Sequence, residues 1–125
     1  QKVVKLLKPL DATAVENGVG PGTPDINYVE GWIELKYLPK WVKSVSEVKI
    51  AIFTPQQRVW LRRRWKAGGN VLFLLQIADD WLLYDGITAA EHVGRVDKDD
   101  LFELALASWE YMPDFYEIAP YLTRG

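Results

Sequence analysis

Two carboxylates and one amine lie within a short stretch of the sequence, at Asp25, Glu34 and Lys36. Carboxylate oxygens are hard ligands of the kind that Mg²⁺ and Mn²⁺ prefer. A cation held by them can polarise a phosphate group and make a bound water more acidic. A lysine beside the cation can orient or deprotonate that water. The same residues also allow a plainer interpretation, a cross-strand ion pair between Asp25 and Lys36 on a solvated face. Their spacing alone leaves both interpretations open.

The residues around this trio predict a tight β-hairpin. Two runs of alternating character, 25–29 and 32–37, are joined by the turn residues Glu30 and Gly31. Counting outward from that turn pairs Val29 with Trp32, Asn27 with Glu34, and Asp25 with Lys36. Opposed residues point to the same side of a sheet, and alternate residues share a face. The polar face of the hairpin is therefore expected to carry Asp25, Asn27, Glu34 and Lys36. The apolar face, expected to meet the core, carries Ile26, Tyr28, Ile33, Leu35 and Tyr37.

Weaker patterns indicate the other elements. We expect a first helix to about residue 10, a loop over 11–23, and an irregular excursion over 38–52 with an extended piece at 48–53. Thr54, Pro55 and Gln57 are typical of a capped helix start, and Gly68 of its end. A buried strand is expected at 71–77, a second strand at 81–84, and a last helix from 97 to about 109. An irregular tail over 111–125 should follow.

This order of elements predicts an α/β sandwich with a mixed central β-sheet. The chain has 125 residues, 49% of them hydrophobic, which suits one domain over 1–125. It contains no cysteine and no apolar run near the roughly 20 residues that span a bilayer. We therefore expect a cytoplasmic protein with neither a thiolate metal site nor a membrane partner.

The charged residues are distributed unevenly along the chain. Residues 1–70 carry 12 lysines and arginines against 6 acidic residues, whereas residues 71–125 carry 3 against 11. The two balances, +6 and −8, give the net charge of −2. A protein that binds a nucleic acid needs cations only on the surface that meets phosphate. The basic first part is compatible with such a surface, and also with ordinary solvated side chains.

Several motifs together carry a resemblance to a known family. Pro24-Asp25 followed by Glu34-Leu35-Lys36 resembles the signature of the PD-(D/E)xK nuclease superfamily. The segment 54–61, Thr-Pro-Gln-Gln-Arg-Val-Trp-Leu, is similar to the S-P-x-Q-x-x-W-L segment of VRR-NUC and phage Holliday-junction-resolvase-like nucleases. Val15-Glu16-Asn17 and Gly22-Thr23 are also similar to that group. The resemblance covers roughly residues 13–85, with its motifs in the same order.

The resemblance implies a restriction-endonuclease-like α/β/α sandwich and a set of roles for single residues. Asp25 and Glu34 would bind Mg²⁺ or Mn²⁺ together with the backbone carbonyl of Leu35, and Glu16 would be a further acid near the metal. Lys36 would position or activate the attacking water. Gln57 would contact the site or the DNA backbone, although a capping box with Thr54 explains this glutamine equally well. Many members of the group also carry a glutamate on the first helix, and residues 2–10 contain none.

Basic residues near these motifs are candidates for DNA contact. Arg58, Arg62 and Arg63 would form a basic helix surface, and Lys40 and Lys43 belong to the excursion before it. The alternative is a solvated face, which is the usual role of a run of charges. Trp32 and Trp41 could stack on bases, although a core or dimer role suits most tryptophans better.

These observations together predict a Mg²⁺- or Mn²⁺-dependent endonuclease that cuts branched DNA. By resemblance, Holliday junctions are the leading substrate, and a two-fold junction suits a homodimer. Flap, nicked or single-stranded DNA is the alternative within the same chemistry. An alternative of a different class is a catalytically silent DNA-binding module on the same fold, which a substitution at Asp25, Glu34 or Lys36 would favour; all three residues are present.

Overall fold

A mixed six-stranded sheet runs through the computed structural model, which describes residues 1–16, 20–43 and 46–124. The strands lie side by side in chain order, β1 to β6. Their bounds are Thr13–Ala14, Ile26–Tyr28, Gly31–Leu38, Asn70–Ile77, Asp80–Asp85 and Ala107–Glu110. β3 and β4 are parallel, and the other neighbouring strands are antiparallel. The mixed central sheet predicted from the sequence is confirmed.

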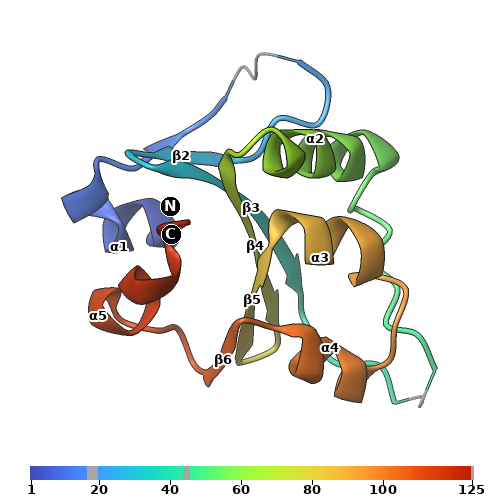
Figure 1. Ribbon diagram of the computed structural model, residues 1–125. Coiled ribbons are helices and arrows are strands. Elements are labelled where there is room, and N and C mark those ends of the chain that lie inside the picture. The colour runs from blue at the N-terminus through green and yellow to red at the C-terminus, as the bar shows by residue number, and fades with distance from the viewer. Residues whose placement is uncertain (17–19, 44–45, 125) are drawn as a thin grey trace.

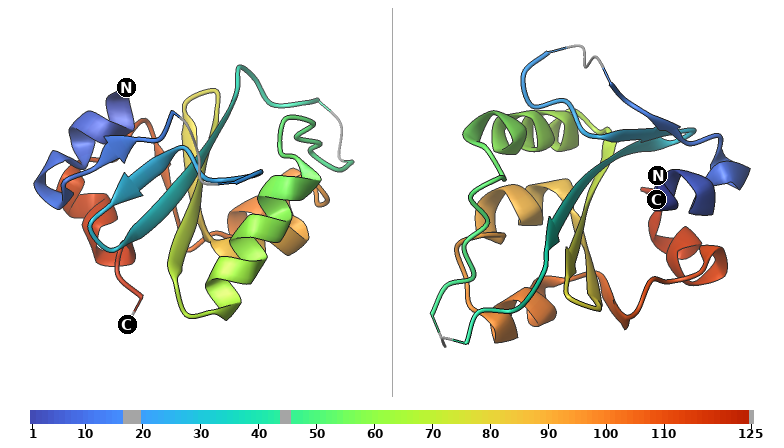
Figure 2. Two further views of the ribbon diagram at one scale, coloured as in Figure 1. Left: turned by 90° about the horizontal axis from the view of Figure 1, so that it is seen from above. Right: turned by 180° about the vertical axis from the view of Figure 1, so that it is seen from behind.

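Helices cover both faces of this sheet (Figure 1). One face carries α1 (Lys2–Leu6) and α5 (Phe115–Ile118), each followed by a short 3₁₀ helix, at Lys8–Leu10 and Ala119–Tyr121. The other face carries α2 (Pro55–Lys66), α3 (Gly86–His92) and α4 (Lys98–Leu104). The view from behind shows the same three layers (Figure 2). The predicted α/β/α sandwich is therefore confirmed. Within the described part of the chain, no helix has the length and apolar character needed to cross a membrane.

Strand β4 separates two hydrophobic cores. Phe73 and Leu75 pack with Trp60 and Leu61 of α2 in one cluster, and Leu72 belongs to a second cluster on the side of α1 and α5. Side chains of a strand alternate between its two faces, so a strand in the middle layer must be apolar at nearly every position. This explains the continuous apolar run predicted as a buried strand.

Helix α2 begins with the capping box that the sequence predicts. The Thr54 hydroxyl accepts a hydrogen bond from the Gln57 N–H (3.2 Å), and the Gln57 side chain accepts one from the Thr54 N–H (2.9 Å). Pro55 occupies the first turn, where a missing N–H is harmless. The helix ends at Lys66, and Gly68 follows with a positive φ of 97°.

The hairpin turn lies one residue earlier than expected, at Val29-Glu30. Strand β2 therefore pairs Ile26 with Ile33 and Asn27 with Trp32, and the predicted pairs Asn27–Glu34 and Asp25–Lys36 are wrong. Contacts distant in the chain fix this register. The Val29 N–H donates to the Leu10 carbonyl (2.9 Å), and a Cβ at Gly31 would lie 2.1 Å from the Asn70 carbonyl oxygen. The partner of each residue moves by two positions, which preserves the predicted faces.

Three other expectations about secondary structure are wrong. The last helix ends at Leu104 rather than near Trp109, because residues 107–110 pair with β5 as strand β6. Helix α3 was not predicted, since Gly86 at its start is a helix breaker in sequence; the Asp85 side chain caps it by accepting from the Thr88 N–H. The tail contains α5, and the expected extended piece at 48–53 forms no strand.

The loop that precedes Asp25 packs directly onto the start of α2. Gly22 has a φ of 82°, and a Cβ there would lie 2.3 Å from the Gln56 carbonyl oxygen and 2.7 Å from the Gln57 nitrogen. A side chain would therefore meet both an unfavourable backbone conformation and rigid helix backbone. Gly22 allows the loop to place Asp25 beside the first turn of α2.

We predict that Gly22→Ala destabilises the protein by roughly 1–3 kcal/mol, because the methyl group adds strain and pushes the loop from α2. Gly20→Ala is the matched control: no atom lies within 4 Å of a Cβ at Gly20, and its substitution should leave stability unchanged or slightly raised. Urea unfolding of the two variants measures the difference. Equal stabilities would contradict a close approach of loop and helix at Gly22.

Candidate active site

The Glu34 carboxylate is buried at the centre of the candidate site. The residue has 0% relative exposure and lies on the face of β3 that α2 covers, beside Phe73 of β4. Within the described part of the chain, no group donates a hydrogen bond to Glu34 Oε1. Burial raises the pKa of Glu34 to about 8, and the adjacent Asp25 carboxyl adds to the increase. Glu34 is therefore poised to bind a proton or a cation.

Asp25 lies directly before β2, opposite Glu34 in the hairpin. Its Oδ2 atom accepts a hydrogen bond from the Leu35 N–H (2.9 Å), and its carboxyl group lies within hydrogen-bonding reach of the Glu34 carboxyl. Asp25 is exposed, so the pair opens to solvent on its side. The N–H and C=O of a residue in an extended strand leave the same edge of that strand. The Leu35 carbonyl is therefore directed toward the side on which Asp25 lies.

Lys36 forms an ion pair with Glu34 along the same strand. The Lys36 Nζ atom lies 3.0 Å from Glu34 Oε2, and the lysine side chain is only 10% exposed. The predicted shared face of Asp25, Glu34 and Lys36 is confirmed. The cross-strand pair of Asp25 with Lys36, which the sequence left open, is replaced by this pair within β3. The amine bonds to Oε2 of Glu34, and the other oxygen, Oε1, has no hydrogen-bond donor among the described residues.

Gln57 has both of the roles that the sequence left open. Its side-chain oxygen closes the capping box of α2, and its Nε2 atom donates to Glu34 Oε2 at 3.5 Å. The cap thus fixes the side chain that reaches Glu34. Gln57 links the first turn of the helix to the buried carboxylate.

The donor set fits a hard divalent cation. The Asp25 and Glu34 carboxyl groups lie beside each other, and the Leu35 carbonyl is directed to the same side. Mg²⁺ is commonly bound by one or two carboxylates together with waters and substrate phosphate. A bound cation would also give Glu34 Oε1 the partner that the described residues do not supply. In the described residues no group of three or more acids, histidines or cysteines is arranged to hold a metal. Glu16, expected as a further acid, is exposed and does not join Asp25 and Glu34.

Arg58 has a structural role rather than the expected exposed position for DNA contact. Its guanidinium donates to the carbonyls of Ala90 (3.0 Å) and Val93 (2.7 Å) at the end of α3, and it lies 4.2 Å from the centre of the Phe53 ring. Burial, followed by the nearby Arg95 and Arg62, lowers the pKa of Arg58 to about 10. A cation at a helix C-terminus satisfies carbonyls that lack partners. Gly94 makes room, since a Cβ there would meet Arg58 Nη2 at 2.8 Å.

The other basic candidates are spread over the surface. Arg62 is half-buried and Arg63 is exposed on α2, and the ion pairs found in the described residues involve neither. Lys40 and Lys43 are exposed, and they follow Leu38, which lies about 13 Å along β3 from Glu34. The structure therefore does not gather these lysines beside Glu34, and the arginines lie farther along the helix that begins beside Glu34.

The two tryptophans considered for base stacking are packed against other side chains. Trp41 stacks on Phe102 and donates from its indole nitrogen to Asp80 (2.7 Å). Trp32 packs edge-on against Trp60, with ring centres 5.4 Å apart. Both tryptophans thus make contacts within the protein, as the sequence favoured over base stacking. The burial of Glu34 and Lys36, in contrast, had no signal in the sequence beyond the apolar residues beside them.

In comparisons with known proteins, the chain matches no protein-family model and no curated protein.

We predict that Glu34→Gln stabilises the cation-free protein at alkaline pH. The pKa of Glu34 rises on folding from 4.5 to about 8, so the folded state binds the extra proton between these values and stability falls as pH increases across that range. Glutamine removes this loss, which is on the order of a few kcal/mol at pH 9. Urea unfolding from pH 5 to 9 measures how steeply the free energy of unfolding changes with pH in wild type and in Glu34→Gln. Glu30→Gln, at an exposed position, is the control and should keep the wild-type slope; equal slopes for all three proteins would contradict the buried carboxyl.

We predict that Arg58→Ala destabilises the protein by roughly 2 kcal/mol, since charged hydrogen bonds to the end of α3 are lost. Arg63→Ala on the same helix should change stability by less than about 0.5 kcal/mol, as expected for an exposed side chain. Thermal unfolding of both variants at one pH tests the contrast. A smaller loss of stability for Arg58→Ala than for Arg63→Ala would contradict the structural role of Arg58.

Proposed function

We propose that the protein is a Mg²⁺- or Mn²⁺-dependent endonuclease that hydrolyses phosphodiester bonds in branched DNA. One observation carries the proposal most: the buried Glu34 carboxylate, one oxygen of which has no hydrogen-bond donor in the described residues, lies beside a second carboxylate, Asp25. A buried carboxylate next to another carboxylate is unfavourable unless a proton or cation joins them. The resemblance to PD-(D/E)xK nucleases supports the same residues independently of this geometry.

Each residue of the site has a defined task in this proposal. Asp25, Glu34 and the Leu35 carbonyl hold the cation, which when bound withdraws charge from the scissile phosphate and makes a coordinated water more acidic. Lys36 keeps one N–H on Glu34 Oε2, and its remaining N–H groups can hold the attacking water or a phosphate oxygen. Gln57 donates to the same Glu34 oxygen and fixes the direction in which Oε1 points. The side chains position the reactants, and the cation supplies the positive charge.

The proposal extends to the substrate and the assembly. By resemblance, a four-way DNA junction leads among the branched substrates, with flap, nicked or single-stranded DNA as the alternatives. Two active sites are needed to cut a two-fold junction on both sides, which favours a homodimer. Arg62 and Arg63 of α2 would meet phosphates. The proposed location is the cytoplasm, that of the host if a phage encodes the chain.

We predict that the purified protein cuts at least one member of a labelled panel of junction, flap, nicked and linear DNA when Mg²⁺ or Mn²⁺ is present, and none after chelation. Lys36→Ala and Asp25→Asn should each lower kcat by at least about 100-fold, since general acid–base and charge-stabilising groups contribute at this scale. Lys2→Ala, an exposed lysine on the opposite face, should cut as wild type does. An intact, folded wild-type protein that cuts nothing in the panel would refute the endonuclease.

A further inference from the structure

A groove of about 340 Å³ lies between the first half of α2 and the loop that precedes Asp25. Its walls are formed by Pro21, Pro55, Gln56, Val59, Trp60 and Arg63. The five residues from α2 follow helical spacing along one side of that helix. The groove is therefore built by two segments that Gly22 holds in backbone contact.

The lining of this groove is apolar with one cation. Val59 is 54% exposed in the middle of α2, between arginines at 58 and 62, where a polar residue would be the usual choice. Two proline rings, Pro21 and Pro55, complete the exposed apolar surface, and Trp60, which is only 2% exposed, backs it from the core. The lining contains no carboxylate, and Arg63 supplies a positive charge at its rim. These features suit a flat apolar group attached to an anion.

The groove and the candidate active site share the first turn of α2 and the loop before Asp25. Gln56 lines the groove, and the next residue, Gln57, donates to Glu34 Oε2 at 3.5 Å. On the loop side, Pro21 lines it, and the chain reaches Asp25 four residues later. Along α2, Arg63 lies about 9 Å from Gln57 at 1.5 Å per residue. This rise is on the order of the spacing of neighbouring nucleotides along a strand, so one strand could span the first turn of α2 and Arg63.

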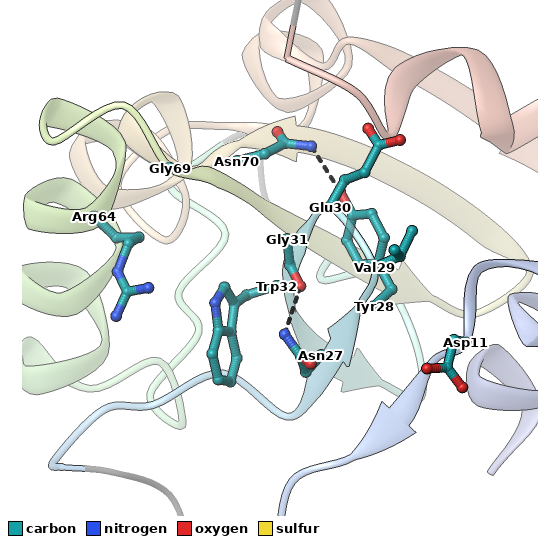
Figure 3. Close-up of a pocket in the computed structure, with 10 residues that line it drawn as sticks. All are labelled: Asp11, Asn27, Tyr28, Val29, Glu30, Gly31, Trp32, Arg64, Gly69 and Asn70. Carbon is teal, nitrogen blue, oxygen red and sulfur yellow. Dashed lines mark hydrogen bonds between the residues drawn. The ribbon is translucent and has the colours of Figure 1, made fainter.

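A second cavity, of about 320 Å³ at the tip of the hairpin, has the opposite character (Figure 3). Its lining includes the carboxylates of Asp11 and Glu30, which repel a polyanion. Its arginine, Arg64, lies 4.5 Å from the centre of the Trp60 ring, and the Asn27 amide donates to the Gly31 carbonyl. These groups already serve the protein itself, so this cavity fits an oligonucleotide less well than the groove does.

We propose that the groove beside α2 holds the base of an unpaired nucleotide next to the scissile phosphate, with Arg63 on a neighbouring phosphate. This rests on the proposed nuclease function and names its substrate class. The faces of a paired base are covered by its neighbours in the duplex, and drawing such a base out costs free energy that an unpaired base does not. The groove therefore selects DNA with an unpaired nucleotide at the cleavage position, such as a flap or single strand, over a fully paired four-way junction.

Binding tests the groove without requiring cleavage. Fluorescence anisotropy with a single-stranded oligonucleotide, in the absence of divalent cation, compares wild type with Val59→Asp, which places a carboxylate in the groove. Affinity should fall about tenfold, the scale of one lost base contact. Val29→Asp is the matched control, since Val29 is 66% exposed at the hairpin tip and should retain wild-type affinity. A loss for Val59→Asp no greater than for Val29→Asp overturns the groove as the binding site.

Cleavage then tests the substrate class. Two labelled DNAs of the same sequence, one with the cleaved position unpaired in a flap and one fully paired, are compared with Mg²⁺ or Mn²⁺. We expect at least a tenfold preference in kcat/KM for the flap, and loss of that preference in Val59→Asp. Equal cleavage of both DNAs overturns the inference and leaves the nuclease intact. Binding that depends on Val59, without cleavage of any DNA, supports the groove and refutes the nuclease.

Discussion

The Glu34 carboxylate sits with 0% exposure in the sheet face between β2 and α2, and much of the surrounding structure is arranged around it. A carboxylate in such a place must share its charge or remain protonated. Lys36 and Gln57 both donate to one of its oxygens, Oε2, whereas Oε1 has no donor among the described residues. A buried oxygen without a donor is costly, and a cation or a proton on it would remove that cost.

The first turn of α2 is positioned by constraints that act together. The capping box fixes the Gln57 side chain, and Gly22 lets the loop before Asp25 approach the backbone of Gln56 and Gln57. Asp25 follows this loop, and Gln57 belongs to this helix. The contact between loop and helix therefore also sets the distance between Asp25 and Gln57. The same contact forms the floor and one wall of the groove beside α2. The candidate active site and the groove beside it thus both depend on the close approach of Gly22 to the backbone of α2.

Local sequence patterns predicted the faces of the hairpin but not its register. Alternation from Ile26 to Lys36 assigns each side chain to a face, and a shift of two positions leaves that assignment unchanged. The register is set by Leu10 and Asn70, which no pattern within the hairpin can include. For the same reason the sequence predicted the α2 cap, a local feature, and missed α3, whose start is capped by Asp85 at the end of a strand.

Arg58 shows the same limit for charged residues. In sequence it belongs to a basic run with Arg62 and Arg63, and spacing along the helix cannot separate them. The fold separates them, because α3 ends beside Arg58 and supplies carbonyls that need donors. The resemblance rests on motifs whose residues are close in the chain. It could not show how deeply Glu34 and Lys36 are buried, which depends on α2 packing over β3.

Charge at the site links the cation to the substrate. With Glu34 protonated, as its raised pKa favours at neutral pH, the formal charges of Asp25, Glu34 and Lys36 sum to zero. A divalent cation that displaces this proton changes the sum to +1. If the site holds such a cation, as proposed, a polyanion would approach the loaded site more readily than the empty one. A proton and the cation would compete for the same oxygens, so the affinity for the cation would fall at low pH. Proton, cation and phosphate would in this way be coupled through a single buried carboxylate.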